Sequence, residues 1–276
     1  MSRAEPAPVA GRARVGVFGG SGFYSFLDDM VEVDVETPFG PPSAPVSIGS
    51  VGPTPVAFLA RHGARHQFLP HQVNYRANLW ALREVGVERV LAPCAAGSLQ
   101  PHVHPGEFVV LDQLVNRTWG RQDTYAGGPV PGIGGHVSWA DPYCPELRQA
   151  VIEAAAAEGI TCHPAGTVVV VQGPRFSTRA ESAWFRSAGW EVINMTQYPE
   201  AYLARELGLC YAAMALITDY DTGLEGVGGI EPVTMDVVFA RLAENVERTK
   251  GLLARAVPAA AGAGGACGCQ APLPAL

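Results

Sequence analysis

Short runs of apolar residues, separated by polar and glycine-rich segments, recur along most of the chain. The runs are rich in valine, leucine and isoleucine and end at breaker residues, which is typical of buried β-strands. The pattern predicts strands at 14–18, 31–36, 45–51, 56–60, 90–93, 108–115, 167–172, 192–195 and 209–218.

Between several of these strands, the apolar positions repeat with the period of an α-helix. This pattern predicts helices at 73–85, 145–158, 178–188, 199–207 and 235–257. Thr178 and Glu181 have the spacing of a capping box, which fixes the start of the helix at 178–188. Gly86 and Gly208 stand where two helices are expected to stop, because glycine readily adopts the left-handed conformation of a helix end.

The alternation of strands and helices predicts an α/β fold, with one mixed β-sheet flanked by helices. We expect a single domain over residues 14–257, a length that can bury a substantial core. Residues 1–13 are expected to form a disordered N-terminus. From Pro258 onward the residues are mostly small and bury little, so 258–276 is predicted to be a flexible C-terminal tail.

Composition and charge exclude several classes of function. The chain has 276 residues, 48% of them hydrophobic, and a formal net charge of −7, which argues against a nucleic-acid surface. Lys250 is the only lysine, so a Schiff-base lysine and the lysine of a P-loop have no other candidate. We find neither the apolar core of a signal peptide near the N-terminus nor an apolar stretch of membrane-spanning length, and we expect a cytoplasmic protein.

Six cysteines are scattered along the chain without the paired spacing of a zinc site, so no metal is expected. The cysteines are Cys94, Cys144, Cys162, Cys210, Cys267 and Cys269. The first four occur in apolar or loop contexts that favour small buried thiols. The last two flank a single glycine and either form a strained redox pair or have no chemical role.

Two carboxylates, Asp219 and Asp221, stand one residue apart at the end of the last predicted strand. An ionised carboxylate taken out of water costs several kcal/mol unless a partner compensates it. The acids therefore either solvate a loop or hold a ligand, and this segment alone does not decide between the two.

The ends of two other predicted strands carry groups that suit an anion. Ser21 lies in a glycine turn at 19–22, where backbone N–H groups and the hydroxyl can bind an oxyanion such as phosphate. Arg61 and His62 follow the strand at 56–60, and the planar fork of an arginine matches phosphate oxygens. The alternative for both segments is an exposed turn without a ligand.

Two further strand ends offer small or hydroxyl residues. The strand at 90–93 runs into small residues, beginning with Cys94 and Ala95, that leave backbone N–H groups open to a ligand. Thr196 follows the strand at 192–195 and either caps the next helix or donates its hydroxyl to phosphate. Ligands of open α/β sheets bind at the carboxyl ends of the strands, so these groups are expected to converge. A purine nucleoside together with phosphate meets both the anion-binding groups and the acids.

The chain also contains, in unbroken order, VFGGSG at 17–22, TPFG at 37–40, RHG at 61–63, VNYRAN at 73–78, GPRFSTRAE at 173–181 and NMT at 194–196. Through these segments it resembles the methylthioadenosine phosphorylases of the trimeric purine nucleoside phosphorylase family, over residues 14–257. The resemblance implies the purine nucleoside phosphorylase-like fold, a homotrimer, and orthophosphate as co-substrate without any other cofactor or metal. Small-molecule nucleosides, rather than nucleic acid or membrane, are the implied partners.

The resemblance also assigns roles to residues of this chain. The implied phosphate site consists of Ser21, Arg61, His62, Cys94, Ala95 and Thr196. The implied substrate-binding residues are Phe176, Ser177, Met195, Asp219 and Asp221 around base and ribose, with His66, His136, Met235, Val238 and Phe239 around the 5′ substituent. Asp219 and Asp221 are the implied catalytic pair, with Asp219 handling the proton. Ser21 and Cys94 replace threonines that are common in relatives, which keeps the hydroxyl at the first position and only the backbone contact at the second.

The implied reaction is phosphorolysis of 5′-methylthioadenosine to adenine and 5-methylthioribose 1-phosphate, a step of purine and methionine salvage. An aspartate at 219 accepts from a 6-amino group, whereas a 6-oxopurine is better matched by an asparagine amide. The alternatives are phosphorolysis of 6-oxopurine nucleosides or methylthioinosine, or of another adenosine with a small 5′ substituent such as a halogen. A nucleoside hydrolase and a non-catalytic adenosine-binding protein are rivals from other classes.

Overall fold

The computed structural model describes residues 13–19, 27–224 and 235–270, with the backbone alone at 28, 29 and 235–243. The predicted N-terminal extension up to residue 12 and the predicted phosphate ligand Ser21 lie outside these ranges. None of the described helices is both long enough and apolar enough to cross a membrane.

In the described ranges the strands form one 11-stranded sheet with parallel and antiparallel pairs, which confirms the predicted mixed α/β fold. The strands are β1 (Val15–Gly19), β2 (Asp28–Val33), β3 (Val46–Val51), β4 (Thr54–Ala60), β5 (Arg89–Ser98), β6 (Phe108–Val110), β7 (Gln113–Arg117), β8 (Cys162–His163), β9 (Thr167–Val171), β10 (Val192–Asn194) and β11 (Cys210–Tyr220). The helices are α1 (Tyr75–Glu84), α2 (Pro145–Ala157), α3 (Arg179–Ser187), α4 (Gln197–Glu206) and α5 (Met235–Gly262).

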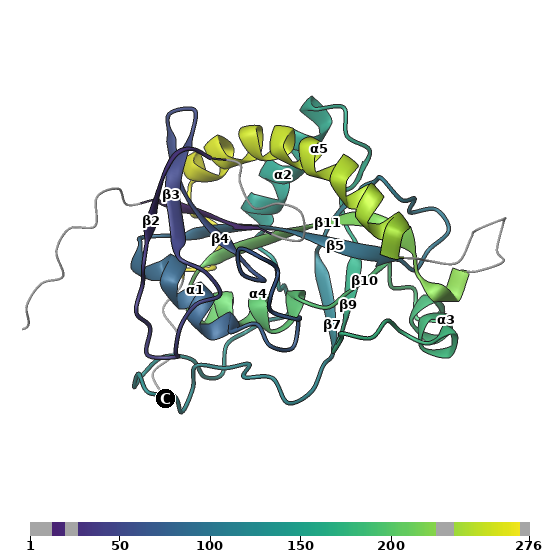
Figure 1. Ribbon diagram of the computed structural model, residues 1–276, viewed down its shortest axis with the longest axis horizontal. Helices are drawn as coiled ribbons and strands as arrows, with labels where there is room; N and C mark the ends of the chain where they lie inside the picture. The colour runs from purple at the N-terminus through teal and green to yellow at the C-terminus, as the bar shows by residue number, and fades with distance from the viewer. Residues whose placement is uncertain (1–12, 20–26, 225–234, 271–276) are drawn as a thin grey trace, which may run out of the picture.

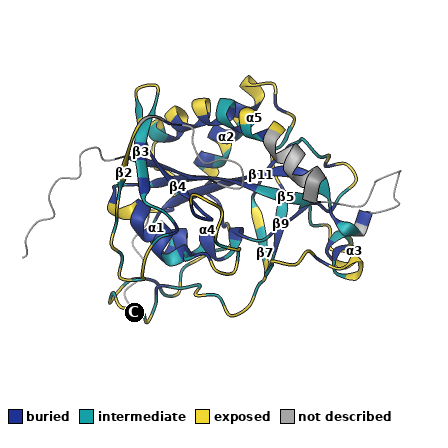
Figure 2. Cartoon of the chain, viewed as in Figure 1, coloured by how far each residue is buried: buried dark blue, intermediate teal, exposed yellow. Residues whose placement is uncertain are grey.

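Helices cover both faces of this sheet. Figure 1 shows α2 and α5 along one face and α1 and α4 along the other, with α3 near the end that carries β7, β9 and β10. Figure 2 shows the sheet and the inner sides of these helices as the buried part of the molecule. Val90 and Leu91 of β5 belong to the hydrophobic clusters on opposite faces, as expected for consecutive residues of a strand.

The sheet branches at β5, and this branching positions the site. One edge of β5 pairs with β11 along almost its whole length. The other edge pairs with β1 only at residues 89–91 and with β10 only at 97–98. Between these two pairings, none of the described strands pairs with the backbone of β5 on that edge. A place where strand connections diverge to opposite sides is where open α/β sheets bind ligands.

Three strand predictions are wrong in detail. The strand predicted at 31–36 begins and ends three residues earlier, as β2. The segment predicted as one strand at 108–115 forms two, because β6 pairs with β11 and β8 whereas β7 crosses to pair with β9. Strand β5 extends to Ser98 rather than ending at 93, because β11 continues beside its small residues. The two-residue strand β8 is not predicted from the sequence, since it depends on pairing with β6 alone.

The helix predictions hold in their positions, including the capping box of α3, in which Thr178 and Glu181 each accept from the other's backbone N–H.

The predicted flexible tail does not describe residues 258–270. Helix α5 continues through Pro258 to Gly262, and Ala260 and Cys269 are buried. Arg89 donates to the Ala263 carbonyl at 2.7 Å, which adds a polar contact between this segment and β5.

Candidate active site

A cavity of about 190 Å³ lies where β5, β10 and β11 converge. Most of the residues predicted for the site line it: Arg61, His62, His66, Cys94, Ala95, Phe176, Ser177, Met195, Thr196, Asp219 and Asp221. These residues come from five separate segments of the sequence, and the sheet brings them together. The convergence predicted from the strand ends is therefore present in the fold.

The other predicted site residues are not placed in this cavity. His136 is exposed, in the long connection between β7 and α2, and it is not among the residues that line the cavity. Met235, Val238 and Phe239 belong to the first turns of α5, and their side chains lie outside the described part of the structure. Ser21 also lies outside it.

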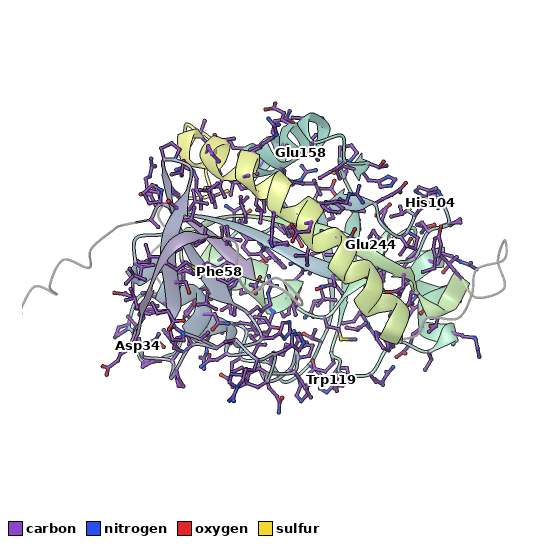
Figure 3. The ribbon with its side chains drawn as sticks, turned by 45° about the horizontal axis from the view of Figure 1, so that its top comes forward. Asp34, Phe58, His104, Trp119, Glu158 and Glu244 are labelled. Carbon is purple, nitrogen blue, oxygen red and sulfur yellow. The ribbon has the colours of Figure 1, made fainter. Side chains whose placement is uncertain are left out.

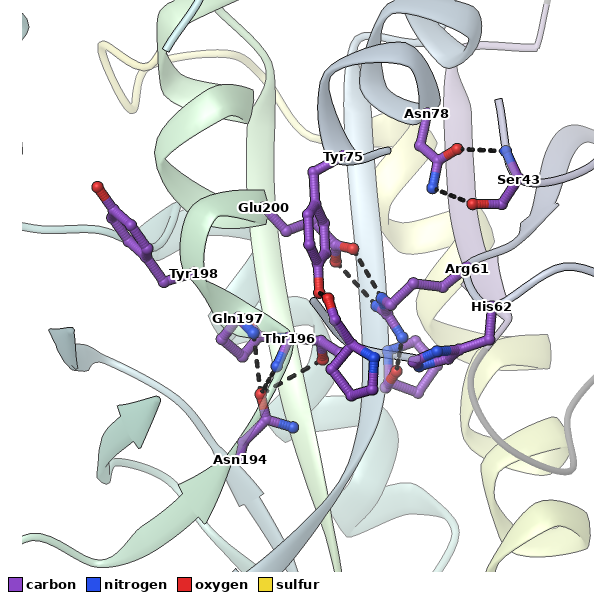
Figure 4. A network of polar contacts seen from close by, with 12 residues as sticks. Ser43, Arg61, His62, Tyr75, Asn78, Asn194, Thr196, Gln197, Tyr198 and Glu200 are labelled. Carbon is purple, nitrogen blue, oxygen red and sulfur yellow. Dashed lines mark hydrogen bonds and ion pairs between the residues drawn. The ribbon is translucent and has the colours of Figure 1, made fainter. Parts of the chain in front are cut away.

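Arg61 forms a buried ion pair with Glu200 of α4. Its side chain is 1% exposed, and its Nε and Nη2 donate to the two carboxylate oxygens of Glu200 at 2.6 and 2.8 Å (Figure 4). Nη1 donates to the Pro93 carbonyl at 3.2 Å, and the Tyr211 hydroxyl donates to Glu200 at 2.7 Å. Burial by itself lowers the pKa of Arg61, but the Glu200 carboxylate outweighs burial and raises it. Arg61 is thus a permanently charged donor whose position is fixed.

His62 is held as a neutral imidazole. Burial, and then the neighbouring Arg61 charge, lower its pKa to about 4. Its Nδ1 lies 2.8 Å from the Phe68 carbonyl, and a carbonyl only accepts, so the proton of the neutral ring is on Nδ1. His66 stacks on the ring with centroids 4.5 Å apart, and burial lowers its pKa as well. Nε2 of His62 remains as an acceptor, which matches an anion that still carries a proton.

Asn194 arranges the groups at the end of β10. Its Nδ2 donates to the Ala95 carbonyl at 2.8 Å, and its Oδ1 accepts from the backbone N–H of Thr196 and of Gln197. The amide thus takes the capping role at the start of α4 that was one alternative for Thr196, whose side chain makes no cap. The Thr196 hydroxyl lies at the cavity wall, where a ligand can replace its long 3.3 Å contact with Asn194.

The unpaired edge of β5 provides a backbone donor. The Pro93 and Ala95 carbonyls point to this edge, since they accept from Arg61 and Asn194. In an extended strand the N–H and C=O of one residue point to the same side, so the Ala95 N–H also points to the gap. By the same alternation the Cys94 N–H points toward β11. The predicted backbone contact is therefore available at Ala95, while Cys94 contributes a buried wall.

Asp219 is placed by a β-bulge. The register of β11 against β5 shifts between Ile217 and Asp219, so that a bulge redirects the chain next to the cavity. The carboxylate accepts from the Thr218 hydroxyl at 2.6 Å. The pKa of Asp219 is raised to about 6, mainly by burial; the hydrogen bond from Thr218 opposes this rise, and the charge of Asp221 adds to it. Near neutral pH, this acid can either hold or release a proton.

Asp221 is held more tightly than Asp219. Ser177 donates to its two oxygens at 2.9 and 3.1 Å, and Ser182 of α3 makes a further short hydrogen bond to it. Burial raises the pKa of Asp221, and the two serine hydroxyls oppose that rise by stabilising the ionised form. The serines join Asp221 to the start of α3, so this acid fixes one wall of the cavity.

Two glycines leave room for these groups. A Cβ on Gly97 would lie 3.0 Å from the Asp219 carboxylate and 3.1 Å from Ile193. A Cβ on Gly173 would lie 2.6 Å from the Met195 sulfur, and Gly173 has a φ of +63°, which side chains rarely adopt. Gly97 therefore keeps the space around Asp219 open, and Gly173 lets the segment leading to Phe176 pass close to Met195.

Several residues that shape the site were missed from the sequence. Glu200, Ser182 and Thr218 each contact a predicted site residue, and Tyr211 supports Glu200. Only the apolar surroundings of Glu200 carried a signal, because a buried acid needs a partner. Asn194 stood within a quoted motif without receiving a role.

The arrangement combines two kinds of chemistry in one cavity. Arg61, the Ala95 N–H and Thr196 supply donors for a tetrahedral anion, and His62 supplies an acceptor for its proton. Asp219 supplies an acid with a pKa near neutrality, and the exposed ring of Phe176 supplies a flat apolar surface. Such a cavity suits an enzyme that brings an anion and a planar ligand together.

Comparison with known proteins gives this class a family. Residues 14–258 match the phosphorylase superfamily, and the chain belongs to it. It is 56% identical to the S-methyl-5′-thioadenosine phosphorylase of Mycolicibacterium smegmatis, over 89% of this chain and 90% of that protein. It is 51% identical to the purine nucleoside phosphorylase of Streptomyces coelicolor, over 95% of each chain.

Solved structures agree with these relatives. The methylthioadenosine phosphorylase of Schistosoma mansoni in complex with adenine superimposes with a TM-score of 0.84 at 38% identity, covering 89% of this chain and 91% of that one. A variant of the adenosine/methylthioadenosine phosphorylase of the same organism, in complex with methylthioadenosine, also gives a TM-score of 0.84, at 37% identity and 91% and 93% coverage. The purine nucleoside phosphorylase-like fold expected from the sequence is thereby confirmed.

Proposed function

We propose that this protein catalyses the phosphorolysis of 5′-methylthioadenosine to adenine and 5-methylthioribose 1-phosphate. A phosphate oxygen attacks C1′ as the bond from C1′ to N9 breaks, and the bonding electron pair passes to the purine. Asp219 donates its proton to N7 of the leaving base, and the phosphate becomes the 1-phosphate of the sugar with inversion. The observation that carries the proposal is a half-buried acid with a pKa of about 6 in the same cavity as Arg61.

The phosphate is proposed to bind Arg61, His62, Thr196 and the Ala95 N–H, with Ser21 completing the site. Glu200 neutralises the guanidinium and accepts from Nε and from one N–H of Nη2, and the Pro93 carbonyl accepts from one N–H of Nη1. One N–H on each Nη is therefore left for the ligand. Because His62 is neutral, its Nε2 accepts a hydrogen bond from the P–OH group of the phosphate dianion. The bound dianion then stabilises the positive charge that develops at C1′ in the transition state.

The base is proposed to stack on Phe176 and to meet Asp219, with Met195 along the ribose. An ionised or shared carboxyl at 219 accepts from the 6-amino group of adenine, and Asp221, held by Ser177 and Ser182, supports this wall. The preference for a 6-amino base rests on position 219, because a buried polar group without a partner discriminates strongly between ligands.

The 5′ substituent is proposed to lie near His66, whose lowered pKa keeps it neutral and able to pack beside an apolar group. Met235, Val238 and Phe239 are proposed to complete an apolar pocket for the methylthio group, and His136 to approach it from a neighbouring subunit, since it is exposed within its own chain. A methyl-sized apolar contact is worth about 1–3 kcal/mol, so the preference for methylthio over hydroxyl is moderate.

We also propose a homotrimer in the cytoplasm that uses orthophosphate as co-substrate and no other cofactor. Trp119 and Trp184 line one surface hollow and are 65% and 50% exposed, and Arg117 lies 4.9 Å above the ring of Trp184 (Figure 3 shows Trp119 on the outside). Adjacent exposed aromatic side chains of this size are typical of an interface. Sedimentation of the full chain tests the subunit number.

One assay tests the reaction. The protein is incubated with methylthioadenosine, with and without orthophosphate, and adenine is followed by chromatography. We expect adenine and a phosphorylated sugar only when phosphate is present. Release of adenine without phosphate would identify a hydrolase, and absence of release in both reactions would identify a binding protein.

The raised pKa of Asp219 favours one second activity, on 6-oxopurine nucleosides. When the carboxyl holds its proton it can donate to the 6-oxo group of hypoxanthine instead of accepting from an amino group. The affinity for inosine, measured as a dissociation constant in the absence of phosphate, is therefore expected to increase relative to that for adenosine as the pH falls below about 6, because the ionised carboxylate can still accept from the 6-amino group but cannot donate to a 6-oxo group. An affinity ratio that is constant between pH 5 and 8 would exclude this role of Asp219.

A further inference from the structure

Four cysteines meet on the face of the sheet that α2 and α5 cover, away from the active-site cavity. Cys144 is the N-cap of α2, Cys210 is the first residue of β11, and Cys267 and Cys269 follow α5. All four Sγ atoms lie within 4.8 Å of one another, and those of Cys210 and Cys267 are 3.5 Å apart. Three of these thiols are buried and that of Cys267 is half-buried.

The spacing of the sulfurs matches a tetrahedral thiolate site. Zinc binds cysteine sulfur at about 2.3 Å, which places the four sulfurs of a regular tetrahedron about 3.8 Å apart. A disulfide requires about 2.05 Å, and all four cysteines are free thiols in this structure. Four thiols that face one another without other strong partners gain most by binding one soft cation, which replaces their protons.

Backbone hydrogen bonds fix two of the four cysteines, Cys144 and Cys210. The Cys144 N–H donates to the Tyr211 carbonyl at 2.8 Å, and the Cys210 N–H donates to the Glu88 carbonyl at 2.9 Å. The N-terminus of α2 directs its positive end at Cys144, and this favours a thiolate there. These two sulfurs are therefore presented by rigid elements, which is what a preorganised metal site requires.

The C-terminal segment brings the other two sulfurs. The backbone N–H of Gly265 donates to Glu146 at 3.0 Å, which holds the segment beside α2. Between the two cysteines, Gly268 has a φ of +71°, a conformation that lets the short loop turn. The sequence did not reveal the cluster because its members come from three separate segments, whereas sequence patterns detect ligands that are close along the chain.

We propose that Cys144, Cys210, Cys267 and Cys269 bind one Zn²⁺ ion, which fixes the segment after α5 to α2 and β11. The site is structural: four protein ligands leave no open position for a substrate, and none of the four cysteines lines the active-site cavity. The role of the ion is to hold down a segment of small residues that has little apolar surface of its own.

The test uses the full chain purified under reducing conditions and loaded with ZnCl₂. Elemental analysis and native mass spectrometry are expected to give about one Zn²⁺ per chain. The Cys267→Ser/Cys269→Ser variant is expected to lose the ion, and the Cys162→Ser control is expected to keep it, because Cys162 is outside the cluster. Loading with Co²⁺ instead is expected to give the visible absorption bands of a tetrahedral thiolate site in wild type only.

Loss of the site is expected to lower the melting temperature by roughly 5 °C or more, while leaving phosphorolysis at 25 °C within about two-fold of wild type. That activity shows that the double variant is folded. The proposal is overturned if the zinc-loaded wild type binds no Zn²⁺ while all six cysteines titrate as free thiols after denaturation, or if its mass shows the loss of hydrogens that marks disulfides.

Discussion

The two ends of the active-site cavity satisfy their charged groups in opposite ways. At the anion end, Arg61 is paired with Glu200 through two short hydrogen bonds, and Tyr211 completes the acid's partners. At the acid end, the bond from Thr218 is the one hydrogen bond to the Asp219 carboxylate among the described contacts, and its pKa rises to about 6. Arg61 is buried and Asp219 is half-buried, and the two groups also differ in their protein partners.

This difference separates the roles of the two ends. An arginine that is ion-paired through two hydrogen bonds keeps its charge and position through the reaction, and this suits a group that only binds and stabilises. An underpaired acid has a proton that is easily gained or lost, which suits proton transfer. The site thus has a rigid anion end and a titrating acid end. Asp221 resembles the anion end, because two serines hold it.

The largest expected effect is loss of the titrating acid. Asp219→Ala should reduce kcat for methylthioadenosine by about 10²- to 10⁴-fold, since general acid catalysis contributes on that scale. Phosphate binding should remain nearly unchanged, because Arg61 and Thr196 are at the other end. Steady-state kinetics measures the first quantity, and the phosphate-dependent rise in melting temperature measures the second. Turnover within three-fold of wild type would remove Asp219 from the proton-handling role.

The next largest effect is the loss of stability when the ion pair between Arg61 and Glu200 is broken. Glu200→Ala leaves the Arg61 guanidinium, which is 1% exposed, without its counter-ion. Removing one partner of a buried ion pair costs about 3–5 kcal/mol of unfolding free energy, which urea denaturation can measure. The matched control is Glu247→Ala, which breaks the exposed pair with Lys250 and should cost less than about 1 kcal/mol. Equal losses in the two variants would show that the Arg61 pair is not stabilising the anion end.

The pH dependence of activity tests the acid end directly. A pKa of about 6 means that the proton needed at N7 is present below that pH, and that its occupancy falls tenfold per unit above it. At saturating phosphate, kcat/KM for methylthioadenosine should therefore decline above about pH 6. Asp219→Asn removes this titration, so its much lower kcat/KM should be independent of pH over the same range. A decline that persists unchanged in the variant would assign it to phosphate instead.

The sequence predicted the polar groups that line the cavity better than the groups that hold them in place. Arg61, Thr196 and Asp219 were found because each stands at the end of an apolar strand, and this position is visible in the pattern. Glu200 and Ser182 lie on helices, and their partners are distant along the chain, so no local pattern identified the site residues that they contact.

The same reasoning explains the errors in the fold. Strand positions follow from hydrophobic periodicity, but the division of 108–115 into β6 and β7 depends on which strands lie beside each half. The residues after Pro258 have a composition that suggests an unpacked tail. Tertiary contacts from Arg89 and Glu146 instead hold this segment in place, and composition alone does not reveal them.

The smallest expected effect comes from loosening Asp221. Ser177→Ala removes one of the two serines that donate to this carboxylate and leaves Ser182. Because a hydrogen bond to a charged group is worth about 1.5–3 kcal/mol and one partner remains, kcat/KM should fall by roughly 3- to 30-fold. Ser187→Ala is the control, since its hydroxyl donates to the Trp184 carbonyl on the exposed side of α3.

The decisive measurement is the pKa of Asp221, which is determined by NMR of the protein with labelled carboxyl groups. Burial already raises this pKa, and the serine bonds oppose the rise, so Ser177→Ala should raise it further and leave that of Asp219 nearly unchanged. If both pKa values rose together, the two acids would titrate as one coupled pair. The contrast would then lie between the anion end and the whole acid pair, with no separate rigid role for Asp221.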